Sequence, residues 1–401
     1  KAWRDDVVKI KKALQNLHDE NQAPVLIDKD SACVALIQRP DSPRENDTDG
    51  RKHDDQKKSA IRAAFGSQGI VSQMVRRFPD DDKTGLQVRD KNPNSKKHGP
   101  RLLRAVSDML ITSLGMTYGS PAAYYVHQLG FDPAFAEQIV VEYWVRYRQT
   151  KPPKADFIAV VRQYANGYLE IVLPDPETGQ PQPRCSVYEA SHHLQLLFSR
   201  GRLKDRVYAR YSDVPDERVL TFFQSQLKSR EEPTLIVPQV GDWRSRNTAW
   251  FHDDAIIYGQ VKFDSHTWDA DDLKNVRIVK MLADEQHNMR YWSDRDDTEG
   301  LLTVHDNLAQ FPTIYSIDAR KEDAKKDIGG NIQRSRVIEF SALLMQPEDD
   351  ELRQAAWCQI PHLSRLHPGW GKNAIVHTYP IHVIHHLIND ALWAVFEKGR
   401  S

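Results

Sequence analysis

The sequence predicts an α/β protein built from two units, and three observations lead to this prediction. Segments with strand character alternate with segments of helical character along the first part of the chain, which is typical of a parallel sheet with helices. Two adjacent prolines, Pro152 and Pro153, then interrupt the chain, because neither can continue a helix. A second unit opens with an expected strand pair and closes with two expected helices.

In the first unit, the sequence predicts two main strands, and each of them is followed by a helix. We expect strands over residues 33–38 and 69–75, with a further short strand over 24–28. Helices are expected over 56–65 and 100–114. The second of these has proline at its first turn and glycine directly after its last turn, a common pattern at helix ends.

A third helix is predicted over residues 131–149, where apolar and aromatic residues such as Ile139, Tyr143 and Tyr147 recur at helical spacing. The expected division is therefore an α/β domain at 1–120, a helical linker at 121–151 and a larger α/β domain at 152–401.

The larger domain begins with an expected antiparallel hairpin, in which Ala165, Asn166 and Gly167 form the turn. Residues 233–239 are a continuous apolar run and predict a fully buried strand. The remaining expected strands are 156–162, 168–173, 255–261, 276–282, 313–317 and 336–345, and the expected helices are 187–199, 215–227, 350–366 and 380–396. This order is compatible with a ribonuclease-H-like layout, which other α/β folds share.

Composition narrows the class of protein. The chain has 401 residues, which at about 150 residues per domain corresponds to two or three domains. Hydrophobic residues make up 40% and charged residues 28%, which allows a sizeable core and argues against global disorder. No apolar run reaches about 18 residues, so we expect no membrane-spanning helix. Because the chain begins with Lys1 and no signal-peptide pattern follows, we expect a fragment, a processed form or part of a longer protein.

The absence of characteristic sequence motifs argues against several kinds of site. Neither of the glycine-rich phosphate-binding patterns occurs, which argues against a nucleotide-driven motor and a dinucleotide dehydrogenase. The three cysteines are far apart, which excludes a disulfide scaffold and suits a reducing cytoplasm. His382 and His386 are spaced to share a helix face, but no glutamate stands between them in the zinc-protease pattern. Core or surface histidines are the favoured reading, and we expect no metal site there.

Charge is distributed unevenly, although the net charge is only -1. Residues 1–110 carry a net charge of +5, and the remainder carries -6. A local basic surface of this kind can bind phosphates while the whole chain stays neutral. The alternative is a solvated helix face. The basic residues concerned are Lys57, Lys58, Arg62, Arg101 and Arg104.

Polar residues near the expected core strands of the second unit are further candidates for a catalytic or phosphate-binding site. A two-metal nuclease needs carboxylates that converge from such strands, but residues 156–162 have no acid after the first position. Arg244 and Arg246 follow the strand at 233–239 and could bind a phosphate, with a nearby tryptophan stacking on a base; the alternative is a structural salt bridge. Glu339 interrupts an apolar strand, so it lies on a wet face or is paired with a buried arginine.

These segments together resemble the MID and PIWI domains of Argonaute proteins. Gly69, Ser72 and Gln73, followed by a helix ending in Leu114 and Gly115, resemble the MID pocket for a guide 5′ phosphate. Tyr315 and Ser316 resemble a late PIWI strand, and Tyr379-Pro380 resembles the entry to the terminal PIWI helix. The order of motifs is most similar to the bacterial PIWI-RE family, named for an arginine and a glutamate.

The resemblance implies a Rossmann-like MID domain followed by a ribonuclease-H-like PIWI domain. It implies a cytoplasmic module that binds a single-stranded guide RNA or DNA and its target, in defence against invading nucleic acid. It further implies a DinG-type helicase and a restriction-endonuclease-like protein as partners, and no membrane. Gln73 matches the glutamine at the guide phosphate, Arg244 or Arg246 matches the family arginine, and Glu339 matches the family glutamate.

The sequence also departs from that pattern. The MID lysines expected on the later helix fall at about Met109 and Ser113, so other basic residues would have to replace them. The two aspartates of an active slicer fall at about residues 160–162 and 239, where no acid stands. We therefore expect a degenerate nuclease core without a metal requirement.

Two other functions remain open at this point. One is an active nuclease that uses Mg²⁺ or Mn²⁺, for which the candidate carboxylates are Asp242, Asp264, Asp318 and Glu339. The other is a protein-binding scaffold within a defence complex, which the neutral net charge favours.

Overall fold

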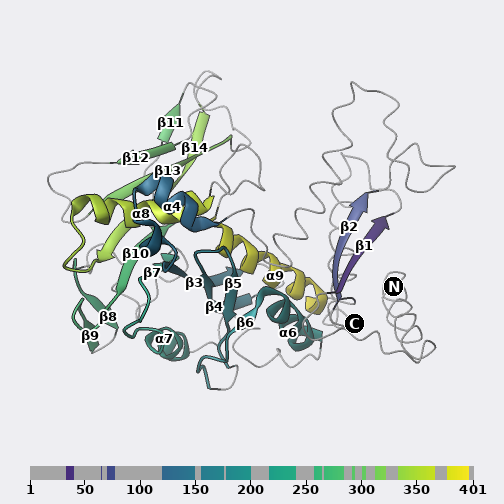
Figure 1. The fold of residues 1–401 in the computed structure, drawn as a ribbon. Coiled ribbons are helices and arrows are strands. Elements are labelled where there is room, and N and C mark those ends of the chain that lie inside the picture. The colour runs from purple at the N-terminus through teal and green to yellow at the C-terminus, as the bar shows by residue number, and fades with distance from the viewer. Residues whose placement is uncertain are drawn as a thin grey trace. The chain divides into compact units, whose positions relative to one another are not determined.

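A computed structural model describes the parts of the chain that are discussed below. These are residues 33–39, 65, 70–76, 120–149, 155–175, 178–199, 216–240, 257–263, 266–283, 291–293, 300–303, 312–321, 333–365 and 377–396. The chain divides into two compact units (Figure 1), and each is described by itself. Unit 1 comprises residues 1–116, 185–204 and 385–401, and unit 2 comprises residues 117–184 and 205–384.

Unit 1 contains a parallel strand pair, as the alternation of strands and helices predicts. Strand β1 (Cys33–Arg39) pairs with β2 (Ile70–Arg76) in a register that sets Cys33 opposite Ile70. Unit 1 also holds β6 (Cys185–Ser186), α6 (Val187–Ser199) and the part of α9 (Tyr379–Phe396) from His385 onward. The helix expected over 56–65 is described only at Phe65, which is helical, and the elements expected over 24–28 and 100–114 lie outside the described residues.

Unit 2 is organised around one large mixed sheet. Its strands are β3 (Val140–Gln149), β4 (Ala155–Gln163), β5 (Leu169–Val172), β7 (Thr234–Pro238), β10 (Val276–Leu282), β11 (Tyr291–Ser293), β12 (Gly300–Thr303), β13 (Thr313–Lys321) and β14 (Gln333–Leu344). They lie side by side in the order β12-β13-β14-β10-β7-β3-β4-β5, with β11 also beside β14. Strands β3, β7 and β10 are mutually parallel, and the other pairings are antiparallel.

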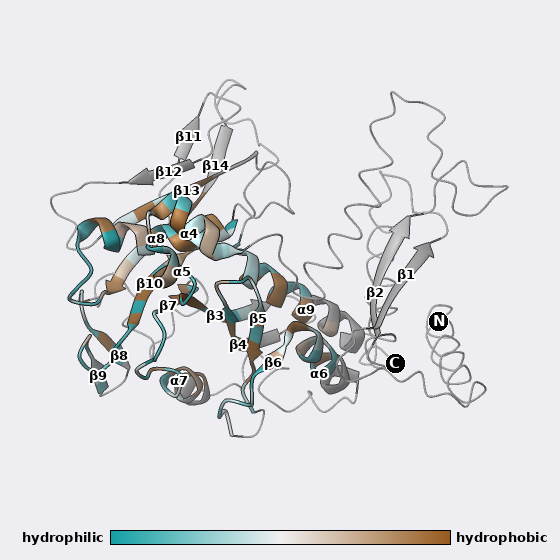
Figure 2. Cartoon of the chain, in the orientation of Figure 1, coloured by the Kyte–Doolittle hydropathy of each residue, from teal (hydrophilic) through white to brown (hydrophobic). Residues whose placement is uncertain are grey.

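The parallel centre of the sheet explains the apolar run in β7. All five residues of this strand are buried, because parallel neighbours stand on both sides and each face is covered. Figure 2 shows the same trend in colour, with hydrophobic residues gathered on the central strands and hydrophilic residues in the turns. The predicted buried strand is therefore confirmed.

The helix predicted over residues 131–149 is wrong. The structure has a four-residue helix, α5 (Pro133–Ala136), and then the ten-residue strand β3. Both Tyr143 and Trp144 are fully buried, on opposite faces of the sheet. A strand that is buried on both faces loses the alternation that marks strands, so its apolar residues also satisfied the helical spacing.

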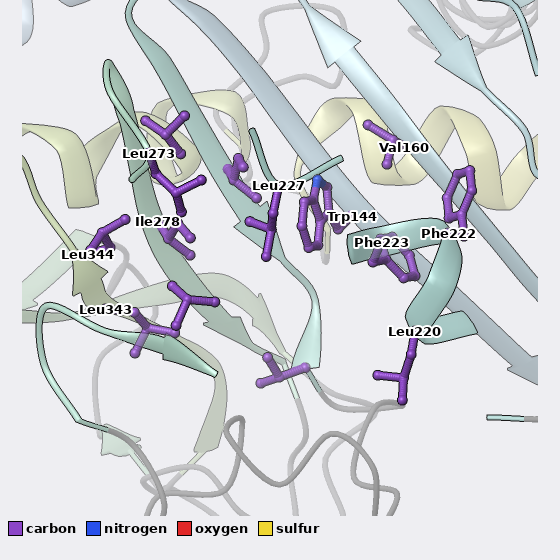
Figure 3. Close-up of a cluster of buried hydrophobic side chains, with 14 of the residues drawn as sticks. Trp144, Val160, Leu220, Phe222, Phe223, Leu227, Leu273, Ile278, Leu343 and Leu344 are labelled. Carbon is purple, nitrogen blue, oxygen red and sulfur yellow. The ribbon is translucent and has the colours of Figure 1, made fainter. Parts of the chain in front are cut away.

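The two faces of the sheet are covered by different helices. Helix α7 (Asp216–Gln224) packs on the face that carries Trp144, whose ring stacks on Phe223 at a centroid distance of 5.0 Å. Figure 3 shows this cluster, which continues along the sheet to Ile278 and Leu344. Tyr143 points to the other face, where its hydroxyl lies beside Ser364 of α8 (Glu351–Arg365). Helix α4 (Pro121–Leu129) packs against α8 on that side (Figure 1).

The hairpin between β4 and β5 closes as expected. Gly167 has a φ of 90°, a conformation that favours glycine, and its N–H donates to the carbonyl of Tyr164 at 2.8 Å. A separate small sheet consists of β8 (Val261–Phe263) and β9 (His266–Trp268), so the strand expected over 255–261 begins only at its last residue. Within the described parts of the chain, no helix is both long and apolar enough to cross a membrane.

Candidate functional site

The carboxyl ends of β3 and β7 mark the first candidate site. These strands are parallel neighbours, with Trp144 opposite Pro238, and the N–H of Gln239 donates to the carbonyl of Trp144 at 3.0 Å. From β3 the chain turns back into the antiparallel β4, whereas from β7 it goes on toward β10 on the other side. In α/β sheets, ligands bind outside the carboxyl ends of strands where the connections diverge in this way.

The described side chains at this edge are basic or neutral. Arg146 on β3 is buried with 2% of its surface exposed, and Gln239 is 6% exposed. Between Tyr143 and Gln149, and between Val237 and Val240, the described residues include no carboxylate. Residues 160–162, where one slicer aspartate was expected to fall, lie on β4, and the other expected position is the buried Gln239.

The one acidic residue of β3, Glu142, lies nearer the other end of the strand and is paired with two arginines. Glu142 is 1% exposed, and its carboxylate oxygens lie 3.1 Å from Arg162 Nε and 3.1 Å from Arg230 Nη2. Two guanidinium groups offset the cost of burying this carboxylate. Arg230 donates to both carboxylate oxygens and so takes lone pairs that a metal ion would need.

Glu339 is likewise paired. It lies on β14, and its Oε1 is 3.2 Å from Nζ of Lys280 on β10 and 2.9 Å from Oγ of Ser341, which donates to it. The side chain of Lys280 is 3% exposed and that of Glu339 is 15% exposed. The sequence suggested a wet face or a buried arginine, and the partner is a buried lysine from a neighbouring strand.

The other predicted site residues are distributed as follows. Gln73 lies on β2 opposite Leu36 in the parallel pair of unit 1. Asp318 lies on β13, next to Ile317, which pairs with Val337. The remaining predicted residues lie outside the described ones: Lys57, Lys58, Arg62, Arg101, Arg104, Asp242, Arg244, Arg246 and Asp264.

A buried polar cluster on the α8 side was not expected from the sequence. Arg365 Nη1 donates to the Oγ and to the carbonyl oxygen of Ser316 on β13. The hydroxyl hydrogen of Ser316 is then directed to Nδ1 of His362, 2.7 Å from Oγ. Desolvation, followed by the charge of Arg365, lowers the pKa of His362 from 6.5 to about 4. The signal in the sequence was the pair His362 and Arg365, three residues apart on one predicted helix.

The described residues do not fit a magnesium or manganese ion. Within the part of the chain that the structure describes, no group of three or more His, Cys, Asp or Glu side chains could hold a metal. Glu142 on β3 and Glu339 on β14 each bind a cationic side chain instead. No step of a metal-dependent reaction is therefore derived from them.

Comparisons with known proteins were made at the level of sequence and of structure. No protein-family model matches the sequence, and no curated protein matches it. Among solved structures, Argonaute of Kluyveromyces polysporus with a guide RNA is 10% identical, with a TM-score of 0.36 over 90% of this chain and 46% of that chain. The C-terminal lobe of a budding yeast Argonaute is 9% identical, with a TM-score of 0.31 over 90% of this chain and 78% of that chain. This chain thus spans less than half of the first of these proteins, and TM-scores this low carry no argument about function.

Proposed function

We propose that this chain is an Argonaute-like nucleic-acid-binding module with a degenerate nuclease core. The observation that carries the proposal is the strand order of unit 2. Three antiparallel strands, β3, β4 and β5, are followed by β7 and β10, which add in parallel on the other side of β3. This order supports a ribonuclease-H-like PIWI sheet. The parallel pair of β1 and β2 supports a Rossmann-like MID domain before it.

Binding is assigned to two sets of basic residues. The first set lies in the MID domain and comprises Lys57, Lys58, Arg62, Arg101 and Arg104. In addition to this set, Gln73 on β2 is the residue that contacts a guide 5′ phosphate. The second set is Arg244 and Arg246, which follow β7 in the sequence. Phosphate contacts from arginine position a strand without reading its sequence.

Loss of nuclease activity is part of the proposal. An in-line cleavage with two metal ions needs two free carboxylates at the ends of central strands. The described ends of β3 and β7 carry none, and Glu142 and Glu339 are engaged by Arg162, Arg230 and Lys280. The module would then act by holding a guide and its target.

The biological setting belongs to the same proposal. The motif order resembles the PIWI-RE type, for which guide-dependent recognition of invading nucleic acid in bacterial defence is the expected role. A DinG-type helicase and a restriction-endonuclease-like protein would be the partners that act on the recognised strand. The module would work in the cytoplasm, with a guide of RNA or DNA.

Fluorescence anisotropy with labelled single strands tests the binding. We expect 5′-phosphorylated strands to bind more tightly than 5′-hydroxyl strands, because the phosphate adds a charge-assisted contact. Affinity should fall as salt rises, since Lys and Arg contacts release counterions. Neither strand should be cut in the presence of Mg²⁺ or Mn²⁺. Cleavage that is lost on Asp242→Ala would replace this proposal by an active nuclease.

A further inference from the structure

The turn end of the β4–β5 hairpin carries two stacked tyrosines. Tyr164 and Tyr168 stand opposite each other, and the N–H of Tyr164 donates to the carbonyl of Tyr168 at 2.9 Å. Their rings are stacked with centroids 6.1 Å apart and planes 28° apart. Tyr168 is 49% exposed, whereas large aromatic side chains elsewhere on this sheet, such as Tyr143 and Trp144, are fully buried.

A row of alternating charges crosses the sheet beside these rings. Glu142 on β3 is opposite Arg162 on β4, and Arg162 is opposite Glu170 on β5. Arg230 extends the row beyond Glu142, at 3.1 Å, and Arg184 extends it beyond Glu170, at 3.9 Å. Three arginines and two glutamates give this hairpin row a net charge of +1.

The hairpin row fixes the inner ring of the tyrosine pair. The guanidinium carbon of Arg162 lies 5.5 Å from the centroid of the Tyr164 ring, within the range of a cation–π contact. The Tyr164 hydroxyl donates to Glu170 Oε2. Burial, followed by this hydrogen bond, raises the pKa of Tyr164, so the ring remains a neutral donor. Tyr168 is thus stacked on a ring that is held in place by two other contacts.

The outer end of the hairpin row is accessible. Arg184 has 53% of its side chain exposed, and its distance of 3.9 Å from Glu170 is at the upper limit for an ion pair. A surface pair of this kind contributes little, so the guanidinium is available to a phosphate. The exposed ring of Tyr168 is linked to the exposed Arg184 through Tyr164 and Glu170. An exposed aromatic ring together with an exposed arginine is the combination with which proteins hold single-stranded nucleic acid.

We propose that Tyr168 and Arg184 form a contact site for single-stranded nucleic acid, with a base stacked against Tyr168 and a phosphate bound by Arg184. The inference rests on the proposed function and adds a site for it within unit 2. Exposed tyrosines also occur in protein interfaces, but the exposed guanidinium of Arg184 is complementary to a phosphate. Stacking is tolerant of sequence, so this contact would add affinity without selecting a base.

Single-residue variants of the full chain test the site with fluorescein-labelled oligo(dT) and oligo(U). Tyr168→Ala should weaken binding of at least one strand by about 10-fold, and Tyr168→Trp should retain it. Arg184→Ala should also weaken binding and should reduce its salt dependence. The control is Tyr124→Ala on α4, because Tyr124 is the comparably exposed tyrosine at 41%, and this variant should bind like the wild type.

The outcomes separate the two proposals. If the wild type binds and both Tyr168→Ala and Arg184→Ala bind equally well, the contact site is refuted while the proposed function stands. If Tyr124→Ala loses as much affinity as Tyr168→Ala, the effect is not specific to the hairpin and the site is again refuted. If the wild type binds neither strand at low salt, the proposed function fails and this inference fails with it. An ultraviolet cross-link from a 4-thiouridine strand to the peptide that contains Tyr168 would support the site directly.

Discussion

His362 illustrates how the fold determines the charge of a single residue. Its Nδ1 accepts a hydrogen bond from Ser316, and Arg365 occupies the other side of that hydroxyl. A protonated ring would place a second buried positive charge close to the Arg365 guanidinium, which contacts the same hydroxyl. The neutral form is therefore the one that fits the folded protein.

Stability should consequently fall in mild acid. The unfolded chain binds the His362 proton with a pKa of 6.5, and the folded chain does so only at about 4. The contribution of His362 is therefore complete above pH 6.5 and is lost as the pH falls toward 4. Between pH 7 and pH 5 this amounts to about 2 kcal/mol. Urea unfolding of the wild type and His362→Gln at both pH values measures it, and an equal pH dependence in the two proteins would contradict the account.

Sequence reasoning identified Glu339 but not its partner. A glutamate within an apolar strand is visible in one sequence, because a buried carboxylate requires a compensating group. Lys280 lies far away in the chain and meets Glu339 only because β10 and β14 pair in a particular register. The register between distant strands is set by packing of the whole sheet, so this pair could not be predicted from the sequence.

A buried arginine of the sheet binds the start of helix α8. Arg277 on β10 donates to Asp349 from Nε at 2.8 Å and from Nη2 at 3.2 Å, and its guanidinium lies 4.9 Å from the Trp357 ring of α8. Trp357 Nε1 also donates to Asp349, at 3.1 Å. The carboxylate just before α8 thereby joins the helix to the centre of the sheet.

Removing Asp349 should therefore be costly, whereas removing its neighbour should not. Asp349→Ala leaves a buried guanidinium without its main counter-charge, which costs about 3–5 kcal/mol. Glu348→Ala removes a partner of the same arginine, 2.9 Å away, but the side chain of Glu348 is 64% exposed. That change should cost less than about 1 kcal/mol. Urea unfolding compares the two variants, and similar losses for both would refute the assignment.

Helices and strands could be predicted from the sequence where the spacing of apolar residues fitted only one type of secondary structure. Helix α6 (Val187–Ser199) begins and ends where it was expected. Helix α8 differs by one residue at each end, and α9 differs by one residue at its start. Strand β3 was mistaken for a helix, because burial on both faces removed its alternation. The error mattered for the site, since β3 lies beside β7 and its carboxyl end forms part of the first candidate site.

At the scale of the whole molecule, the order of strands could be predicted only in part. The hairpin of β4 and β5, the buried β7 and the parallel pairing of β1 and β2 were all expected. The position of β3 between β7 and β4 required the structure. The two-domain division at 1–120 and 152–401 stays a prediction, as do the basic residues of the first unit.

The central claim is that this chain holds a nucleic-acid strand without cutting it. The most direct measurement is to purify the protein from its host, extract any bound nucleic acid, and label the 5′ ends with and without phosphatase. The account predicts a narrow band of short strands whose labelling requires phosphatase, because their ends are phosphorylated. A preparation without bound nucleic acid, which also fails to bind added single strands at low salt, would contradict the claim and favour a protein-binding scaffold.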